Sequence, residues 1–459
     1  MSTSRSVERS LGSLSWTASR LALVSLLAVV LTASAAPGER EAHLQKAIDE
    51  LHDGRPLPAV AEATEAVRAD PRSAEALAVL GLARLKCGEW EKAGSRFNEA
   101  IAIDSLSPEA HLGLGVIEAS MMRYSDAIPH LRRATSSRLF PGAAYTALAT
   151  SLEDLDLHGE ASLAMREAGT YTDELAEDQL SNIRAFAGIF AAHDGLALCT
   201  VPEDFRSTSV RLRYSNSHIA VPVVLNGSTR GDFFFDTGHG GWMMLDDEYA
   251  ERLDLTYTGE ITTITVLGTI VLKAAVLDSI RIGGLTMLNV PVLVCKDYPF
   301  GEAGLIGWKV IQRVNTAIDF KQKQIRFSSQ DVPGPQWRNI AGGESTTCVP
   351  FANLTSLFVI ASFGDETPRA YVFDTGCDVS VMHYGDPGGP ESARKGTPCI
   401  VRIGDLAFDV PWIDYSDFTA IHRKGRYYFP GVIGLNVMSQ CVLHIFPKES
   451  MLCLEKSGS

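Results

Sequence analysis

The sequence predicts a multidomain chain in which an α-solenoid of paired helices precedes an all-β domain with two lobes. Three observations in its 459 residues carry this prediction. Small residues recur every 34 positions between about 40 and 175, the composition turns to Val, Ile, Thr, Phe and Gly after about Val210, and one short motif occurs twice in the second half. Regularly spaced Ala-rich segments are typical of packed helices, and short apolar runs between turn residues are typical of strands.

The composition is that of a globular protein and excludes several functions. Hydrophobic residues make up 46% and charged residues 21%, and the formal net charge is −14. An acidic chain has no electrostatic attraction for phosphates, so nucleic acid is not an expected partner. Cysteines occur singly, without the paired spacing of a zinc site, and histidines are scattered, so we expect no metal and no cofactor.

Residues 1–36 have the three parts of an export signal. Arginines precede an uncharged apolar run from Leu21 to about Leu31, and small residues follow up to Pro37. The run is shorter than the ~20 apolar residues of a spanning helix, which favours a cleaved signal peptide over an anchor. We expect a periplasmic or secreted protein with no membrane contact after cleavage, or a membrane-anchored one if the signal is retained.

Residues 40–175 repeat with a period of 34. The repeated positions hold small residues, as at Gly81 and Gly115, or an aromatic residue, as at Trp90 and Tyr124. Alanines continue the same step over four units at Ala66, Ala100, Ala134 and Ala168. This pattern resembles the tetratricopeptide repeat, with units at 40–73, 74–107, 108–141 and 142–175, of which the first and last are degenerate.

The resemblance implies antiparallel helix pairs that stack into a right-handed solenoid with a concave groove. Such grooves hold peptides or partner proteins, and a spacer or self-association role is an equally weighted alternative. Residues 176–212 are expected to form a capping helix, through Ile189-Phe190, followed by a linker.

The second half is expected to contain few helices. Turn residues end its apolar runs at Asn226-Gly227, Gly283-Gly284 and Gly404-Asp405, which are hairpin signals. Two further hairpins are expected over 317–327 and 442–454.

One pattern occurs twice in this half. Three apolar or aromatic residues lead into Asp236-Thr237-Gly238 and again into Asp374-Thr375-Gly376. Downstream of each lies an apolar pair followed by glycine, at Leu305-Ile306-Gly307 and Val432-Ile433-Gly434. The two aspartates are 138 positions apart and the two glycines 127. We interpret this as a duplication, with one lobe over 213–333 and a second over 334–459.

The doubled pattern resembles the aspartic peptidases of the pepsin and retropepsin clan, most closely the retropepsin-like domains of bacterial exported proteins. The resemblance implies an endopeptidase in which Asp236 and Asp374 meet at the floor of a cleft and activate a water between them. Two close carboxylates cannot both ionise, so one acts as acid and the other as base. The resemblance also implies that Gly238 and Gly376 approach the opposite carboxylate, and that Thr237 and Thr375 hydrogen-bond across to the other lobe.

The residues after the two motifs depart from the family pattern of Ser or Ala. Cys377 is small enough to replace either. His239 is a candidate modifier of Asp236, and an obstruction of the site or an outward-pointing turn histidine are the alternatives. The candidate flap over the substrate is residues 264–269, and its second-lobe counterpart, 384–398, is expected to be a loop.

Two further expectations concern function and redox state. A catalytically inactive, peptide-binding scaffold with the same fold is the alternative to a peptidase, and a second enzymatic alternative pairs each lobe with a lobe of another molecule. Cys441 and Cys453 flank the last expected hairpin and could form a bridge under oxidising conditions.

Overall fold

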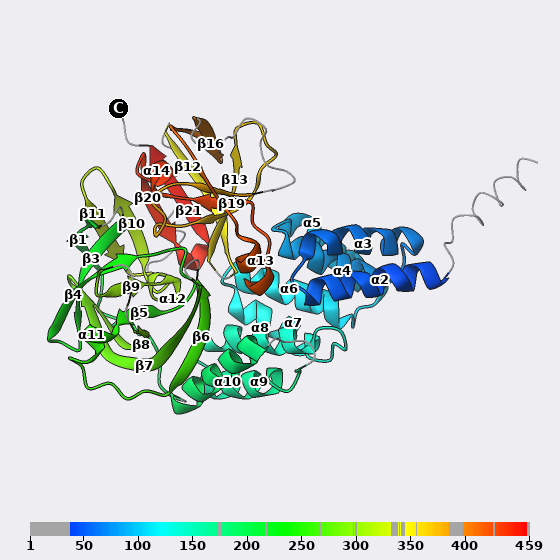
Figure 1. Cartoon of the computed structure of the whole chain (residues 1–459), viewed down its shortest axis with the longest axis horizontal. Coiled ribbons are helices and arrows are strands. Elements are labelled where there is room, and N and C mark those ends of the chain that lie inside the picture. The colour runs from blue at the N-terminus through cyan, green and yellow to red at the C-terminus, as the bar shows by residue number, and fades with distance from the viewer. Residues whose placement is uncertain are drawn as a thin grey trace, which may run out of the picture.

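The computed structural model describes most of the chain after the expected signal peptide, which itself lies outside the described residues. These are residues 37–172, 177–193, 195–215, 218–265, 268–296, 298, 301–331, 338, 340, 345–354, 356–384, 398–425 and 427–456. Figure 1 shows a stack of helices lying along one side of two β-rich lobes. No helix in these ranges is long and apolar enough to cross a membrane.

The first part of the chain is an array of antiparallel helix pairs, as expected. The pairs are α2 (Pro37–His52) with α3 (Pro56–Ala69), α4 (Ala74–Lys86) with α5 (Trp90–Ile103), α6 (Pro108–Ser120) with α7 (Tyr124–Ala134), and α8 (Pro141–Glu153) with α9 (His158–Ala168). The alanines that mark the repeat are completely buried where helices cross. A Cβ at Gly115 would come within 2.6 Å of Leu131, so the period selects small residues because helices touch there.

The turns inside the helix pairs share one backbone conformation. Gly54, Gly88, Met122 and Asp156 lie 34 positions apart, and their φ angles are 68°, 74°, 58° and 58°. A positive φ is favourable for glycine and uncommon for other residues. The repeat geometry therefore imposes the same turn even where the sequence has Met or Asp, and it places these turns in a row along one edge of the array.

A single helix closes the array before the β-rich part begins. This helix, α10 (Glu177–Ala192), packs against α9, and irregular chain follows it. Strand β1 (Ser207–Arg211) pairs with the end of the first lobe, in register from Ser207 opposite Ser328 to Arg211 opposite Gln324. The β domain therefore starts at 207, inside the segment 176–212 that the sequence assigns to cap and linker, because β1 is too short to give a pattern of its own.

Each lobe is built on a sheet with the same central arrangement. The strands of the first lobe are β2 (Arg213–Ser215), β3 (His218–Leu225), β4 (Thr229–Phe235), β5 (Met243–Asp246), β6 (Gly259–Thr265), β7 (Gly268–Ile282), β8 (Leu285–Cys295), β9 (Gly304–Ile306), β10 (Asn315–Asp319) and β11 (Gln324–Ser328). Those of the second lobe are β12 (Thr346–Asn353), β13 (Leu357–Phe363), β14 (Arg369–Phe373), β15 (Val381–His383), β16 (Cys399–Ile403), β17 (Leu406–Val410), β18 (Asp414–Ser416), β19 (Gly431–Ile433), β20 (Cys441–Phe446) and β21 (Met451–Lys456). Helices are few and short there, namely α11 (Asp247–Ala250), α12 (Trp308–Ile311), α13 (Thr419–Gly425), α14 (Leu435–Met438) and the 3₁₀ turn η2 (Pro447–Glu449).

The duplication is visible in the strand pairing. Strand β4 runs parallel to β9, which is antiparallel to β5, and β14 runs parallel to β19, which is antiparallel to β15. The expected hairpins at the ends of the lobes are confirmed as β10–β11 and β20–β21. Strands β10 and β20 pair with each other, from Thr316 opposite Ile445 to Asp319 opposite Val442. This pairing joins the last hairpin of the first lobe to the sheet of the second lobe, while β2 to β9 form a sheet of their own.

The disulfide differs from the expected one. Cys453 on β21 is bonded to Cys348 on β12, and Cys441 is a free, buried thiol. The prediction of a Cys441–Cys453 bridge is wrong because of strand register: Cys441 lies opposite Lys456, whereas Cys348 lies directly opposite Cys453. The bond closes a sequence separation of 105 residues.

Candidate active site

Each aspartate of the doubled motif follows the end of a buried parallel strand. Asp236 follows β4, and its N–H donates to the carbonyl of Ile306 at 3.0 Å; Asp374 follows β14, and its N–H donates to the carbonyl of Ile433 at 3.0 Å. The apolar-apolar-Gly segments of the sequence are the strands β9 and β19 and the glycines that follow them, buried beside the aspartates. The pairing of the two motifs within each lobe thus sets where each carboxyl group emerges.

The two threonines tie the lobes together directly behind the aspartates. Thr237 Oγ1 donates to the carbonyl of Phe373 at 2.7 Å, and Thr375 Oγ1 donates to the carbonyl of Phe235 at 2.6 Å. The N–H of each threonine donates to the Oγ1 of the other, at 3.1 and 3.0 Å. Both side chains are completely buried, so these bonds are shielded from water and fix one loop against the other.

The two glycines bring each loop against the carboxyl group of the other lobe. A Cβ at Gly238 would lie 2.2 Å from Cγ of Asp374, and a Cβ at Gly376 would lie 2.7 Å from Cγ of Asp236. No side chain fits at either distance, so only glycine allows this approach. The structure therefore brings together Asp236, Asp374 and the four residues that the sequence assigns to their support.

Backbone hydrogen bonds orient the two carboxyl groups differently. Asp236 Oδ1 accepts from the N–H groups of Gly238 and His239, both at 2.9 Å. Asp374 Oδ1 accepts from the N–H of Gly376 at 2.7 Å. These backbone donors hold the Asp236 carboxyl group in place within its own loop.

The pKa of Asp374 is raised well above its usual range. Burial is the largest cause, and the negative charge of Asp236 and a hydrogen bond with its carboxyl group raise the pKa further, while the N–H groups of Gly376 and Gly238 oppose the shift. Two carboxylates in contact cannot both be ionised at low cost. The raised pKa of Asp374 therefore favours a pair that retains one proton.

His239 directly follows Gly238 in the loop that carries Asp236. Its imidazole ring fills the space beside two glycines: a Cβ at Gly307 would come within 2.5 Å of Cδ2, and one at Gly241 within 2.8 Å of Nε2. Nε2 is enclosed and has no hydrogen-bond partner among the described residues. Burial lowers the pKa of His239, which the charge of Asp236 partly opposes, so the ring is neutral near pH 7. The ring thus packs beside glycines of its own lobe and lies close enough to Asp236 to be affected by its charge.

Cys377 occupies the matching position in the second lobe. Its thiol donates to the carbonyl of Val379 at 2.9 Å, and burial raises its pKa to about 12. The thiol is therefore protonated and is not a nucleophile at neutral pH.

The candidate flap falls at the tip of the β6–β7 hairpin. Residues 266 and 267 lie outside the described residues, but the strands on both sides pair down to Thr265 opposite Gly268. Asn182 of α10 binds the outer strand through both side-chain atoms, since Nδ2 donates to the carbonyl of Thr262 at 2.5 Å and Oδ1 accepts from its N–H at 2.8 Å. Most of the second-lobe loop, 385–397, also lies outside the described residues.

Sequence analysis missed a second group of polar residues around this site. Lys309 of α12 and Gln312, which follows α12, bond with Glu153 and Asp154 at the end of α8, and Asn353 of β12 donates to Gln312. No sequence signal marks them, because Lys309 and its partners are more than 150 positions apart and belong to different domains.

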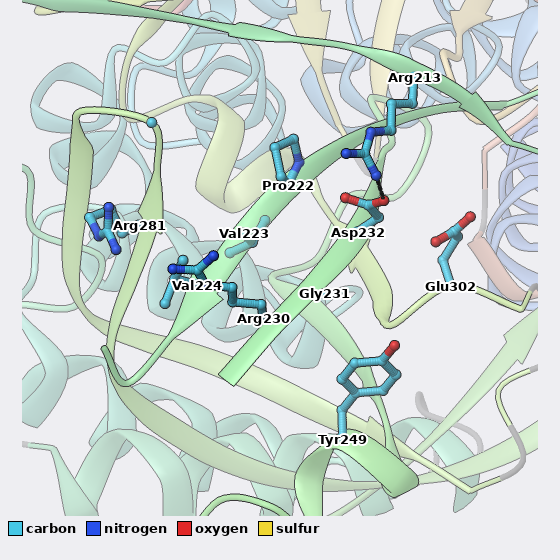
Figure 2. A pocket seen from close by; sticks show the side chains of 11 residues that line it. Arg213, Pro222, Val223, Val224, Arg230, Gly231, Asp232, Tyr249, Arg281 and Glu302 are labelled. Atoms are coloured by element: carbon cyan, nitrogen blue, oxygen red, sulfur yellow. Dashed lines mark hydrogen bonds and ion pairs between the residues drawn. The ribbon is translucent and has the colours of Figure 1, made fainter. Parts of the chain in front are cut away.

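Figure 2 shows residues that line a separate pocket of about 580 Å³ on the first lobe, among them residues of the paired strands β3 and β4. Arg213 and Asp232 form an ion pair at its edge, at 2.5 Å, and Arg230 and Arg281 are exposed beside it. Neither Asp236 nor Asp374 lines this pocket, so it is separate from the site that the two aspartates form.

Comparisons with known proteins agree with the nature of the first lobe. Residues 221–310 match the family model described as aspartyl protease, and this range contains Asp236 and strand β9. The solved structure of the aspartic proteinase from Irpex lacteus is similar with a TM-score of 0.38 and 11% identity, over 55% of this chain and 98% of that one. A structure from a study of pilF from Pseudomonas aeruginosa is similar with a TM-score of 0.28 and 19% identity, over 34% of this chain and 70% of that one. No curated protein matches the chain.

The strand pairing defines a two-lobed β domain behind a helical repeat array, and a segment of its first lobe matches the aspartyl protease model. The match covers the first copy of the motif, and the strand pairing repeats the same arrangement around Asp374 in the second lobe.

The tight fit of Gly238 gives a first test. We expect Gly238→Ala to lower the free energy of unfolding by about 1–3 kcal/mol, because the added methyl group must displace the Asp374 carboxyl group or the loop. Urea denaturation measures the change. The matched control is Gly188→Ala on α10, which has open space around it and is expected to be neutral or stabilising by up to about 1 kcal/mol. Equal stability of the two variants would contradict the close approach of the loop to Asp374.

Proposed function

We propose that the chain is an aspartic endopeptidase in which Asp236 and Asp374 activate a water molecule between them. The single observation that carries the proposal is the close approach of two aspartates from different lobes, held by reciprocal threonine hydrogen bonds and by glycines that leave room for the opposite carboxyl group. A surface pair of aspartates would have neither the burial nor the cross-lobe bonding. The alternative of an inactive peptide-binding scaffold keeps this geometry without turnover.

The chemistry follows from the unequal protonation of the pair. Asp236 accepts a proton from the water as its oxygen attacks the scissile carbonyl carbon, and Asp374 donates its proton to the carbonyl oxygen. The tetrahedral intermediate then collapses: the C–N bond breaks, the proton held by Asp236 passes to the leaving amine, and the hydroxyl proton returns to Asp374. No covalent intermediate and no cofactor is required by these steps.

We further propose that the helical array recruits a protein substrate or partner. A pocket of about 740 Å³ opens between α5, α6 and α7, and it includes Leu106, whose side chain is 74% exposed. Its other residues mix apolar and titratable groups: Asn98, Ile101, Ser105, His111, Leu114, Glu118, His130 and Arg133. An exposed apolar side chain beside such groups supports peptide binding.

Export to an oxidising compartment is part of the proposal. The signal-like pattern of residues 1–36 supports it, and so does the Cys348–Cys453 disulfide, since such bonds persist in the periplasm or outside the cell.

Substitution of the aspartates tests the proposal directly. We expect Asp236→Asn and Asp374→Asn each to lower the cleavage rate of an unfolded protein substrate by at least about 1,000-fold, because each variant removes one partner of the proton transfer. Chromatography of the released peptides measures the rate. Asp232→Asn, which changes an aspartate in the outer pocket near Arg213, is the matched control and should cleave at the wild-type rate. Equal cleavage by all four proteins would refute the assignment.

The protonation of the dyad predicts a bell-shaped pH profile of kcat/KM. Activity needs Asp374 protonated, so the basic limb marks the loss of its proton, and the raised pKa of Asp374 moves this limb above the ordinary range of aspartate toward neutral pH. The acidic limb marks protonation of the second carboxyl of the pair. A rate independent of pH between about pH 3 and 8 would contradict one shared proton.

A further inference from the structure

Three of the four turns along this edge of the array meet the β domain, in addition to the packing of α10 against β6. The turn at Gly88 lies against Ala370, and the carbonyl of Lys86 accepts from the N–H of Tyr428 at 2.7 Å, both in the second lobe. In the next turn, the carbonyl of Met121 accepts from Ser450 Oγ at 2.6 Å. The third turn, 153–156, contacts the first lobe through Lys309, Gln312 and Arg313. One edge of the repeat array therefore spans both lobes (Figure 1).

The contact with the first lobe contains buried charges that the proposed chemistry does not use. Lys309 Nζ lies 2.6 Å from Oε2 of Glu153 and 2.6 Å from Oδ2 of Asp154. The side chains of Lys309, Glu153 and Asp154 are 12%, 3% and 2% exposed. Buried charges are costly to desolvate and persist only with close partners, so the three groups specify a single docked position of α8 on α12.

The same short helix, α12, holds the loop that carries Asp236. The N–H of Trp308 donates to the carbonyl of His239 at 2.7 Å, and the N–H of Lys309 donates to the carbonyl of Gly241 at 3.0 Å. His239 in turn donates its own N–H to Asp236. Two hydrogen bonds therefore separate the catalytic carboxyl group from the backbone of α12, and the Lys309 side chain then joins α12 to the array.

The second lobe holds the loop that follows Asp374 without using residues of the array. Asn436 matches Lys309 in position after the apolar-apolar-Gly segment, and Ser380 matches Trp242 in position after Asp-Thr-Gly. Asn436 Oδ1 accepts from the N–H and the Oγ of Ser380, at 2.9 and 2.7 Å, so the second lobe closes its own catalytic loop. In the first lobe Trp242 instead packs under two cations, Lys309 and Arg313, whose acidic partners lie on the array.

We infer that the helical array is a structural part of the active site, with Lys309 as the positioning residue that holds the Asp236 loop against α8. Gln312 extends the junction to the second lobe, since its Nε2 donates to Asp154 at 2.9 Å and its Oε1 accepts from Asn353 at 3.4 Å. This inference deepens the proposed function and assigns the array a role in the same chain, separate from the recruitment of a partner.

The test uses full-length protein and a variant that leaves no buried charge unpaired, Lys309→Met with Glu153→Gln and Asp154→Asn. We expect kcat to fall about 10- to 100-fold with little change in KM, because the carboxyl group is displaced while the cleft remains. Hydrogen exchange followed by mass spectrometry should show faster exchange of the amides of residues 238–242, at an unchanged melting temperature. The matched control is Lys46→Met with Glu62→Gln, an ion pair of 2.5 Å on the far end of the array, which should change neither readout.

The remaining outcomes contradict either the positioning role of Lys309 or the proposed function. A stable triple variant with wild-type kcat and wild-type exchange at 238–242 would overturn the positioning role. If the triple variant melts well below the wild type, the isosteric Asp154→Asn variant is judged by the same two readouts. If the wild type cleaves no substrate, the proposed function fails, and the exchange rates alone still decide whether the array holds the loop.

Discussion

The structure depends on one contact, the meeting of two acidic side chains from separate lobes, which under the proposed function share a single proton. Such sharing requires a contact that neither lobe can build alone, and the reciprocal bonds of Thr237 and Thr375 provide it at the junction of the lobes. The glycines beside them remove the side chains that would keep the carboxyl groups apart. The pairing of β10 with β20 is a second connection between the two lobes.

The near symmetry of the lobes makes their differences informative. The second lobe secures its loop internally, through Asn436 and Ser380, whereas the first lobe places Lys309 at the matching position and directs it to the array. The array is able to meet both lobes because its turns repeat at a fixed spacing along one edge, including the left-handed residues Met122 and Asp156. The same repeat that stacks the helices thereby also gives regularly spaced contacts with the two lobes.

The sequence predicted those parts of the molecule in which the signal is local or repeated. The 34-residue period predicted the helix pairs, and the doubled Asp-Thr-Gly motif predicted two lobes and the residues that meet between them. Features set by the register of distant strands could not be predicted, such as the pairing of Cys348 rather than Cys441 with Cys453. The position of the His239 ring depends on the neighbouring glycines 241 and 307, and the partners of Lys309 lie in another domain, so neither leaves a pattern within its own segment.

The most direct test of the account is to detect the proton that the two aspartates are proposed to share. Infrared difference spectroscopy of the full-length wild type against the Asp374→Asn variant, recorded near neutral pH, detects a protonated aspartate without any substrate. The account predicts a carbonyl band of a protonated carboxyl group in the wild type that is missing from the variant. Spectra in which the wild type lacks this band, or in which the variant retains it unchanged, would show that no proton resides on Asp374.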